Sequence, residues 1–195
     1  APHDAGSGSS MKDKRSKNEF IKEESRFLRG TIAEGLGQVV TGAISEDDAQ
    51  LTKFHGTYLQ DDRDVRGERT KKRLEKAFSF MIRVRVPGGV ATPAQWLALD
   101  RIAGDFANGT LRLTTRQAIQ FHYIKAPSLG PLIRFLNQDY PNTGYEMSTI
   151  AACGDVNRNV IASANPVESR LHAEIYAWAS KISEHLLPRT RAYHE

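Results

Sequence analysis

The sequence predicts an α+β fold: a ferredoxin-like split βαβ half-domain, preceded by an N-terminal helical arm and followed by the start of an α/β domain. Two observations lead to this prediction. Residues 78–86, 111–114 and 119–124 alternate apolar and polar side chains with the two-residue period of strands. Residues 92–107 and 128–136 repeat apolar side chains at helical spacing. The order strand, helix, strand, strand, helix makes up most of one ferredoxin-like unit.

Such a unit normally has one more strand. We expect this closing strand to come from beyond residue 140, or from elsewhere in a longer chain. Composition and turn signals divide the chain into four parts: a disordered tail (1–17), the arm (18–76), the half-domain (77–145) and the start of the next domain (146–195).

The composition is that of an ordinary globular protein. Of 195 residues, 39% are hydrophobic and 26% are charged, which suits one domain or parts of two. The net charge of +4 is too small to indicate a nucleic-acid partner by itself. Cys153 is the single cysteine, so no internal disulfide can form and a reducing compartment, the cytoplasm, is expected. Because no apolar run approaches the roughly 20 residues that span a bilayer, no membrane partner is expected.

The arm begins with a predicted helix over residues 18–29. Four apolar side chains share one side of it: Phe20, Ile21, Phe27 and Leu28. Gly30 is a plausible C-cap for this helix. Thr31 and Glu34 form the capping-box pattern of a short second helix.

The rest of the arm is less regular. Residues 37–50 are predicted to be a loop, and residues 51–58 a strand. The stretch that follows, to residue 76, is dense in charge and lacks an apolar stripe, which is typical of a solvated face or loop. Three of its arginines could also reach an anion: Arg63, Arg66 and Arg69.

Each strand of the half-domain has one apolar and one polar face. In the first strand, the apolar face carries Phe80, Ile82, Val84 and Val86, and the polar face carries Met81, Arg83 and Arg85. In the second, Leu111 and Leu113 oppose Arg112 and Thr114, and Arg116 lies in a tight turn just after them. In the third, Ile119, Phe121 and Tyr123 oppose Gln120 and His122. If the strands pair in one sheet, the apolar face meets helices and the polar face collects positive charge.

Both helices of the half-domain have start signals. Thr92, Pro93 and Gln95 supply an N-cap, a proline at the first helical position and a capping-box partner. The apolar residues of this helix are Trp96, Leu99, Ile102, Ala103 and Phe106, and Asn108–Gly109 ends it. Ser128 is predicted to cap the second helix, whose apolar residues are Leu129, Leu132, Ile133 and Leu136.

Four arginines with the same parity on one face of the predicted sheet indicate an anionic ligand. A single strand arginine is usually a surface residue or half of an ion pair, but Arg83, Arg85, Arg112 and Arg116 together repel one another. Guanidinium groups match carboxylate and phosphate oxygens two at a time. Two ligand classes fit: single-stranded nucleic acid, or a cofactor or substrate with several acidic groups. Nucleic acid needs stacking aromatics on the open face, and it is disfavoured because Phe80, Phe121 and Tyr123 all have core parity.

The C-terminal part starts a new unit. Residues 148–166 are predicted to form two short strands around a loop that holds Asp155, Asn157, Arg158 and Asn159. A helix is predicted to start at residues 165–168 and to end at Pro188. Its buried side is expected to carry Leu171, Ile175, Trp178, Ile182 and Leu186, and both Trp96 and Trp178 are expected in the core.

Several separated motifs in a fixed order resemble the siroheme-containing sulfite and nitrite reductases, above all the hemoprotein subunits of assimilatory sulfite reductases. The motifs are KFHGTYLQDDRD, IRVRVPGG, GTLRLTTRQAIQFH, GDVNRNV, NPVESRLHAEIYAW and ISEHLLPRTRAY. The most specific is R-L-T-x-R-Q-x-x-Q-F-H, which runs here from Arg112 to His122. The resemblance extends from about Glu23 to Glu195.

The resemblance implies an oxidoreductase that reduces sulfite to sulfide, or nitrite to ammonia, with six electrons at a siroheme coupled to a 4Fe-4S cluster. Arg83 and Arg158 then match the arginines that touch sulfite. Arg112, Arg116, Gln120 and His122 match the residues around the siroheme and its carboxylates, and Arg85 has no clear role. His122 is expected to be a hydrogen-bonding pocket residue rather than an iron ligand. The sequence from Tyr58 to Asp64, with Gln60, matches the family in a scaffold role.

The resemblance also limits what this chain can do. A 4Fe-4S cluster needs about four cysteines, so its ligands are expected outside these residues, no metal ligand is expected within them, and Cys153 is expected to be a small buried residue. These residues match only the N-terminal part of a family member, and alone they are expected to be inactive. The electron donor is either NADPH through a flavoprotein reductase subunit or ferredoxin. Nitrite reduction and, from another class, a basic nucleic-acid-binding module remain alternatives.

Overall fold

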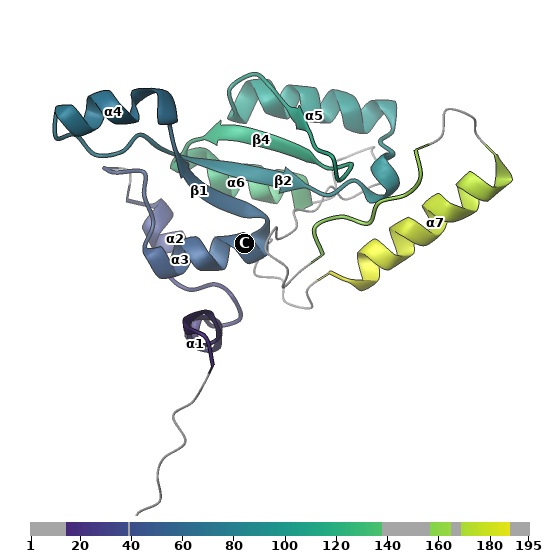
Figure 1. Cartoon of the computed structure of the whole chain (residues 1–195), viewed down its shortest axis with the longest axis horizontal. Helices are drawn as coiled ribbons and strands as arrows, with labels where there is room; N and C mark the ends of the chain where they lie inside the picture. The colour runs from purple at the N-terminus through teal and green to yellow at the C-terminus, as the bar shows by residue number, and fades with distance from the viewer. Residues whose placement is uncertain (1–14, 39, 138–156, 165–168, 188–195) are drawn as a thin grey trace, which may run out of the picture.

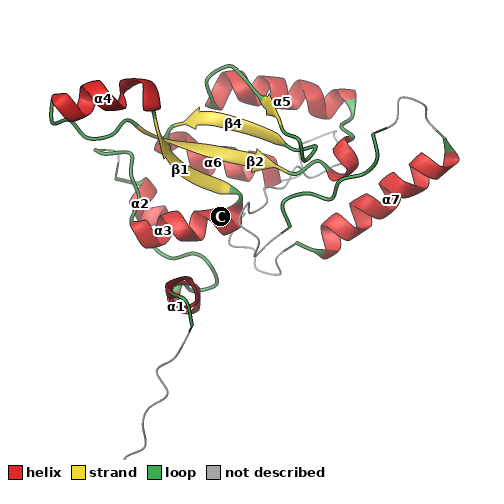
Figure 2. Cartoon of the chain, in the orientation of Figure 1, coloured by secondary structure: helices red, strands yellow, loops and turns green. Residues whose placement is uncertain are grey.

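The computed structural model describes residues 15–38, 40–137, 157–164 and 169–187. Four strands form one sheet in the order β1-β2-β4-β3 (Figures 1 and 2). They are β1 (Thr57–Asp61), β2 (Phe78–Val84), β3 (Arg112–Leu113) and β4 (Ile119–Ile124), and every neighbouring pair is antiparallel. β4 lies between β2 and β3, which a helix connects, so the sheet is the split βαβ arrangement. The predicted α+β, ferredoxin-like fold is confirmed.

The fourth position of the sheet is filled from the N-terminal arm. β1 pairs with the outer edge of β2, with Thr57 opposite Ile82 and Asp61 opposite Phe78. The expectation of a closing strand from beyond residue 140 was therefore wrong for the described residues. The arm's strand also begins later than predicted, because Thr52–His55 forms a 3₁₀ helix, η1, which Gly56 ends at a φ of 73°.

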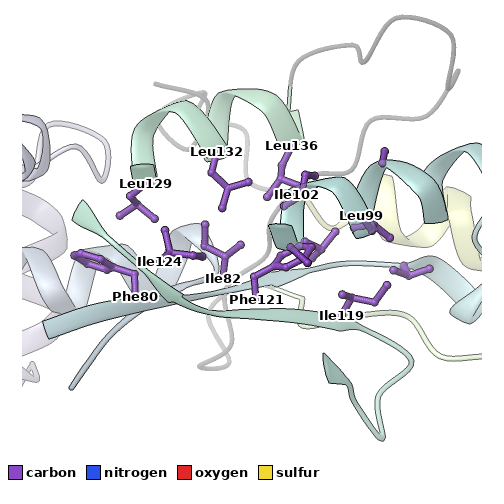
Figure 3. Packing of buried hydrophobic residues seen from close by; sticks show 14 of the residues in the cluster. Phe80, Ile82, Leu99, Ile102, Ile119, Phe121, Ile124, Leu129, Leu132 and Leu136 are labelled. Atoms are coloured by element: carbon purple, nitrogen blue, oxygen red, sulfur yellow. The ribbon is translucent and has the colours of Figure 1, made fainter. Parts of the chain in front are cut away.

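Two helices cover one face of the sheet. α5 (Pro93–Phe106) begins with the predicted capping box, in which the Thr92 side chain accepts from the Gln95 backbone N–H and the Gln95 side chain accepts from that of Thr92. α6 (Ala126–Asn137) begins before Ser128, so Ser128 lies in its first turn and is not its cap. Figure 3 shows both helices directing their leucines and isoleucines onto the strands.

The apolar parity of the strands builds the core. Phe80, Ile82 and Val84 of β2 and Phe121 of β4 are fully buried, and they pack with Leu99 of α5. Each side chain of this kind contributes about 1.5–3 kcal/mol when it leaves water. Because one face of the sheet is filled in this way, side chains of the opposite parity lie on the face away from both helices.

The parity of β4 changes at Tyr123. β2 advances two residues from Phe80 to Ile82 while β4 advances three, from Phe121 to Ile124, so β4 contains a bulge. Tyr123 has a φ of 63° and is 40% exposed, and Ile124 takes its place in the core. The prediction that Tyr123 is a core residue was wrong, because a bulge shifts every later side chain to the other face.

Other predicted apolar residues also lie outside the core. Leu113, in the two-residue strand β3, is 66% exposed, and Trp96 is 45% exposed. In α7 (Arg170–His185), only Ala179 and Ser183 are buried. Four residues of its predicted buried stripe are exposed: Leu171, Trp178, Ile182 and Leu186. Residues 157–164 contain no strand, contrary to the prediction.

The arm is more helical than predicted. α1 (Lys17–Glu24) ends well before Gly30, and α2 (Ile32–Leu36) follows it. The predicted loop contains α3 (Glu46–Leu51), capped by Ser45, and the charged stretch contains α4 (Arg63–Lys71), capped by Asp62. Thr31 makes no capping hydrogen bond within α2, because its hydroxyl donates to Asp48 Oδ2 at 2.6 Å.

Several predictions lie outside the described residues. They concern the tail before residue 15, Cys153, Asp155, the helix start at residues 165–168 and Pro188.

Candidate functional site

Three polar side chains form a row across the sheet, on the face away from α5 and α6. Gln120 of β4 lies directly opposite Arg83 of β2 on one side and Arg112 of β3 on the other. Arg83 is half-buried and Arg112 is exposed. The structure thus brings together two arginines that sequence parity alone had assigned to the same face.

Gln120 connects this row to His122. In the amide orientation that satisfies both ends of its side chain, Gln120 Oε1 accepts from Arg83 Nη2 at 2.8 Å and from Arg83 Nε at 3.2 Å. The amide nitrogen then lies 3.4 Å from His122 Nε2, near the long limit of a hydrogen bond. An amide N–H can only donate, so His122 Nε2 is the acceptor and Nδ1 carries the proton of the neutral ring.

His122 is held in its neutral form. Partial burial lowers its pKa below the ordinary 6.5, and the charge of Arg112 lowers it further. This agrees with the hydrogen-bond direction from Gln120. A neutral imidazole beside two guanidinium groups avoids a third positive charge, and it offers a hydrogen bond to a bound molecule.

A polar cleft of about 620 Å³ crosses the sheet, from the end of β1 and the start of α4 to β4 and β3. Arg112, His122 and Tyr123 line one side, and Gln60 and Arg63 line the other. The cleft also contains acidic groups. Arg66 donates from Nε and Nη2 to Asp61 at 2.6 and 2.7 Å, and this pairing lowers the pKa of Asp61.

The three arginines of α4 have different surroundings. Arg66 is engaged by Asp61, and Arg69 Nε donates to the Glu75 carbonyl at 2.5 Å. Arg63 alone of the three lines the cleft without a contact of this kind among the described residues. Asp62 accepts from Asp64 N–H at the start of α4, which is the scaffold role expected for this stretch.

The segment that carries Arg158 is bound to the hairpin turn between β3 and β4. Asn159 Nδ2 lies within 2.8–3.1 Å of three carbonyl oxygens, those of Val86, Arg116 and Gln117. Gln117 Nε2 donates to the Ala162 carbonyl at 2.7 Å, and Gln117 Oε1 accepts from the Ala162 N–H at 3.0 Å. These contacts bring Arg158 and the exposed turn residue Arg116 to the same end of the sheet.

Two glycines allow this close approach. Gly88 and Gly89 both have positive φ, 64° and 72°. A Cβ on Gly89 would meet the Gln117 Cβ at 2.9 Å, and one on Gly88 would meet Tyr176 Cδ1 of α7 at 2.7 Å. Gln117 was missed by sequence reasoning, and the Pro-Gly-Gly turn was the available signal that another backbone segment packs there.

Arg85 shares the parity of Arg83 but not its surroundings. It is 3% exposed, and its Nη1 donates to Ser183 Oγ of α7 at 2.7 Å. Arg85 therefore lies beneath α7, where it holds the helix to the sheet. Ser183 could not be predicted as the partner of Arg85, because the two residues are 98 positions apart in the chain.

The arrangement is suited to binding an anion. Guanidinium groups from β2 and β3 flank Gln120 on one face of the sheet, and a guanidinium fork pairs well with carboxylate and phosphate oxygens. In the part of the chain that the structure describes, no three His, Cys, Asp or Glu side chains are placed to hold a metal ion. None of the described helices is long and apolar enough to cross a membrane.

Comparisons with known proteins agree with this geometry. A family model described as the nitrite/sulfite reductase ferredoxin-like half domain matches residues 73–138. The sulfite reductase (NADPH) hemoprotein beta-component of Oceanobacillus iheyensis is 58% identical over 177 residues, which is 91% of this chain and 30% of that protein. That of Staphylococcus epidermidis is 57% identical over 178 residues, with the same shares. The Mycobacterium tuberculosis NirA structure aligns with a TM-score of 0.56 at 26% identity, covering 78% of this chain and 28% of that one.

Residues 73–138 are similar to the ferredoxin-like half domain of nitrite and sulfite reductases, and the split βαβ sheet described above agrees with that similarity. Within the class, the chain is similar over most of its length to sulfite reductase hemoprotein beta-components, which confirms the resemblance found in the sequence. The chain spans about 30% of the length of these relatives.

Proposed function

We propose that this chain forms part of a sulfite reductase hemoprotein, which reduces sulfite to sulfide with six electrons at a siroheme coupled to a 4Fe-4S cluster. In this proposal the polar face of the sheet holds the acidic cofactor and its anionic substrate. The observation that carries the proposal is the row Arg83–Gln120–Arg112, which places two arginines of separate strands on either side of one amide.

The residues present fit a large ring that bears carboxylates. Arg112, His122 and Gln60 line the polar cleft, and a carboxylate pairs with a guanidinium fork through two hydrogen bonds. On either side of Arg158, two buried amide atoms have no hydrogen-bond partner among the described residues, Asn157 Nδ2 and Asn159 Oδ1. Buried polar atoms of this kind are costly unless a polar partner reaches them, which supports a ligand at this end of the sheet.

Each residue has a defined task in the proposal. Arg112, Arg116 and Gln120 hold the carboxylates of the siroheme, and neutral His122 offers a hydrogen bond beside them. Arg83 and Arg158 bind sulfite and stabilise the charge that develops as oxygen leaves, without giving up their own protons. When bound, the coupled siroheme and cluster supply the electron transfer. The cluster ligands belong to cysteines outside this chain.

The partners follow from the same proposal. Electrons come from a flavoprotein reductase subunit that uses NADPH, or from ferredoxin. The NADPH route is favoured because the relatives named above are NADPH-dependent by their names. A reducing compartment, the cytoplasm, fits a chain with one cysteine.

Nitrite reduction is the second candidate. It is favoured by the description of the matching half domain, which includes both activities. Comparing kcat/KM for sulfite and nitrite in the complete enzyme separates the two. The nucleic-acid alternative is not favoured, because Phe80 and Phe121 are fully buried and, of the three aromatic residues of β2 and β4 considered above, Tyr123 is the one left exposed for stacking.

The test uses the complete, cofactor-loaded enzyme with Arg83→Ser or Arg158→Ser. We expect sulfite binding to weaken at least 10-fold while the melting temperature changes little, since a charge-assisted hydrogen bond is worth about 1.5–3 kcal/mol. Arg134→Ser is the matched control, because Arg134 is exposed on α6, on the other side of the sheet. Normal sulfite binding combined with a large loss of stability in the first two variants would refute the assignment.

A further inference from the structure

Asn159 is bound to two segments that lie far from it in the sequence. Its side-chain nitrogen, Nδ2, lies 2.9 Å from the carbonyl oxygen of Val86, 2.8 Å from that of Arg116 and 3.1 Å from that of Gln117. All three oxygens are acceptors, so the amide turns its N–H groups towards them. Because Nδ2 has two hydrogens, one of them is shared between two carbonyls. One side chain thus joins the chain just after β2 to the turn between β3 and β4.

The backbone of this turn is strained. β3 ends at Leu113, so the carbonyls of Arg116 and Gln117 lie outside the strand ladder. Gln117 has a φ of 57°, a left-handed conformation that few residues with a Cβ adopt. Because Asn159 binds both carbonyls in succession, it holds the turn in this conformation. It therefore also sets the position of Arg116, which is exposed in the same turn.

The backbone that follows Asn159 is also held in place. The Gly88 N–H donates to the Val160 carbonyl at 2.8 Å. The Gln117 side chain accepts from the N–H of Ala162 and donates to its carbonyl. Asn159 is the first residue of this bound stretch.

We propose that Asn159 is a positioning residue, which places Arg158 and Arg116 at a fixed distance from each other. Arg158 directly precedes Asn159 in the chain, and Arg116 lies in the turn that Asn159 binds. The inference rests on the proposed function, in which Arg158 binds sulfite and Arg116 holds a carboxylate of the cofactor. Asn159 acts through Arg158 and does not itself contact sulfite. Since a misplacement of about 1 Å in an orienting group can cost about 100-fold in rate, the loss of this link should be measurable.

The test measures sulfite affinity in the complete, cofactor-loaded enzyme with Asn159→Leu. Leucine has nearly the shape of asparagine, but its side chain donates no hydrogen bond. We expect the Kd for sulfite, followed by the visible absorption of the cofactor, to rise about 10-fold, well inside the range that a misplaced orienting group produces. The cofactor content should stay near that of the unmodified enzyme, because Arg112 and Gln120 belong to strands that the Asn159 side chain does not bind.

A second readout follows the link itself and does not depend on activity. The Ala162 N–H donates to Gln117 Oε1 at 3.0 Å, so its hydrogen exchange reports whether the stretch after Asn159 stays bound to the turn. We expect this amide to exchange several-fold faster in Asn159→Leu than in the unmodified complete protein, with or without the cofactor.

Combining the change with Arg158→Ser separates positioning from a general loss of structure. If Asn159 acts through Arg158, then Asn159→Leu should add no loss of sulfite affinity in the Arg158→Ser background. A merely structural role would weaken binding equally in both backgrounds. Asn137→Leu is the matched control, because Asn137 is 2% exposed and donates to the Ile133 carbonyl at 2.8 Å within α6. It should lower the melting temperature and leave the Kd for sulfite unchanged.

Three outcomes overturn the inference: an unchanged Kd for sulfite in Asn159→Leu, an equal loss of affinity with and without the Arg158 guanidinium, or unchanged exchange of the Ala162 amide. If Asn159→Leu does not fold, Asn159→Ser goes through the same measurements, because its shorter side chain cannot reach all three carbonyls. An unmodified enzyme that binds neither siroheme nor sulfite is a different result. It refutes the proposed function itself, and the role of Asn159 with it.

Discussion

Removing the Ser183 hydroxyl from α7 should weaken the attachment of this helix to the sheet. Ser183 is fully buried and accepts a hydrogen bond of 2.7 Å from the guanidinium of Arg85, which is 3% exposed. Ser183→Ala removes an acceptor from a buried charged donor. A hydrogen bond to a charged group is worth about 1.5–3 kcal/mol, and the higher helix propensity of alanine returns roughly 0.5 kcal/mol. The net loss is therefore about 1–2.5 kcal/mol.

The loss should be confined largely to α7. Only Ala179 and Ser183 of this helix are buried, whereas Leu171 and Trp178 are exposed, so little apolar burial holds it. Hydrogen exchange of the α7 backbone amides is the assay. We expect protection to fall about 5- to 70-fold in α7, because each 1.4 kcal/mol is a factor of ten. The amides of β2 and β4 should change much less.

Ser180→Ala is the control, since Ser180 is on the same helix and is not fully buried. It makes the same change in helix propensity without touching Arg85. The reasoning fails if the α7 amides exchange equally fast in the Ser183→Ala and Ser180→Ala variants. It also fails if they exchange no faster in Ser183→Ala than in the unmodified chain, because the buried hydrogen bond would then not hold this helix.

Three further predictions concern other parts of the chain. Gly130→Ala should raise the free energy of unfolding by about 1 kcal/mol in urea titrations, because alanine favours the helix and its Cβ meets no atom within 4 Å; a loss of stability would contradict this. Folding lowers the pKa of His55 and His122 below the ordinary 6.5. The contribution of the neutral rings to stability is therefore full above pH 6.5 and is lost as the pH falls towards the folded pKa values. A free energy of unfolding that stays constant between pH 7 and pH 5, or that falls by the same amount in the His55→Gln variant, would contradict this. In the complete enzyme, Gln117→Met should raise KM for sulfite more than it lowers kcat, since two hydrogen bonds that hold the Arg158 segment are lost; an unchanged KM would show that this clamp is not needed.

The strand pattern predicted the core well because burial on one face requires a strict alternation of side chains. Phe80, Ile82 and Phe121 are at zero exposure, as their parity requires. The alternation failed at Tyr123, because a bulge depends on how β4 pairs with β2 and leaves no mark in the local pattern. The α3 helix, in contrast, could have been predicted from Ser45 and the acidic residues that follow it.

Contacts between segments far apart in the chain could not be predicted from the sequence. The arm fills the fourth position of the sheet through β1, and nothing in residues 57–61 indicates their partner. Arg83 and Arg85 have the same parity, yet Arg85 lies under α7 because of Ser183. The candidate site was predictable as a set of residue types on one face, whereas the clamp of Gln117 on the Arg158 segment depended on tertiary packing.

The central proposal is that guanidinium groups on the polar face hold an acidic tetrapyrrole. The most direct measurement is the visible absorption spectrum of the complete protein, purified from cells with adequate siroheme supply. The proposal predicts siroheme bands in the unmodified protein and in Arg134→Ser, and a reduced cofactor content when Arg112 is changed to serine. A colourless unmodified protein, or full cofactor loading without the Arg112 guanidinium, would contradict it.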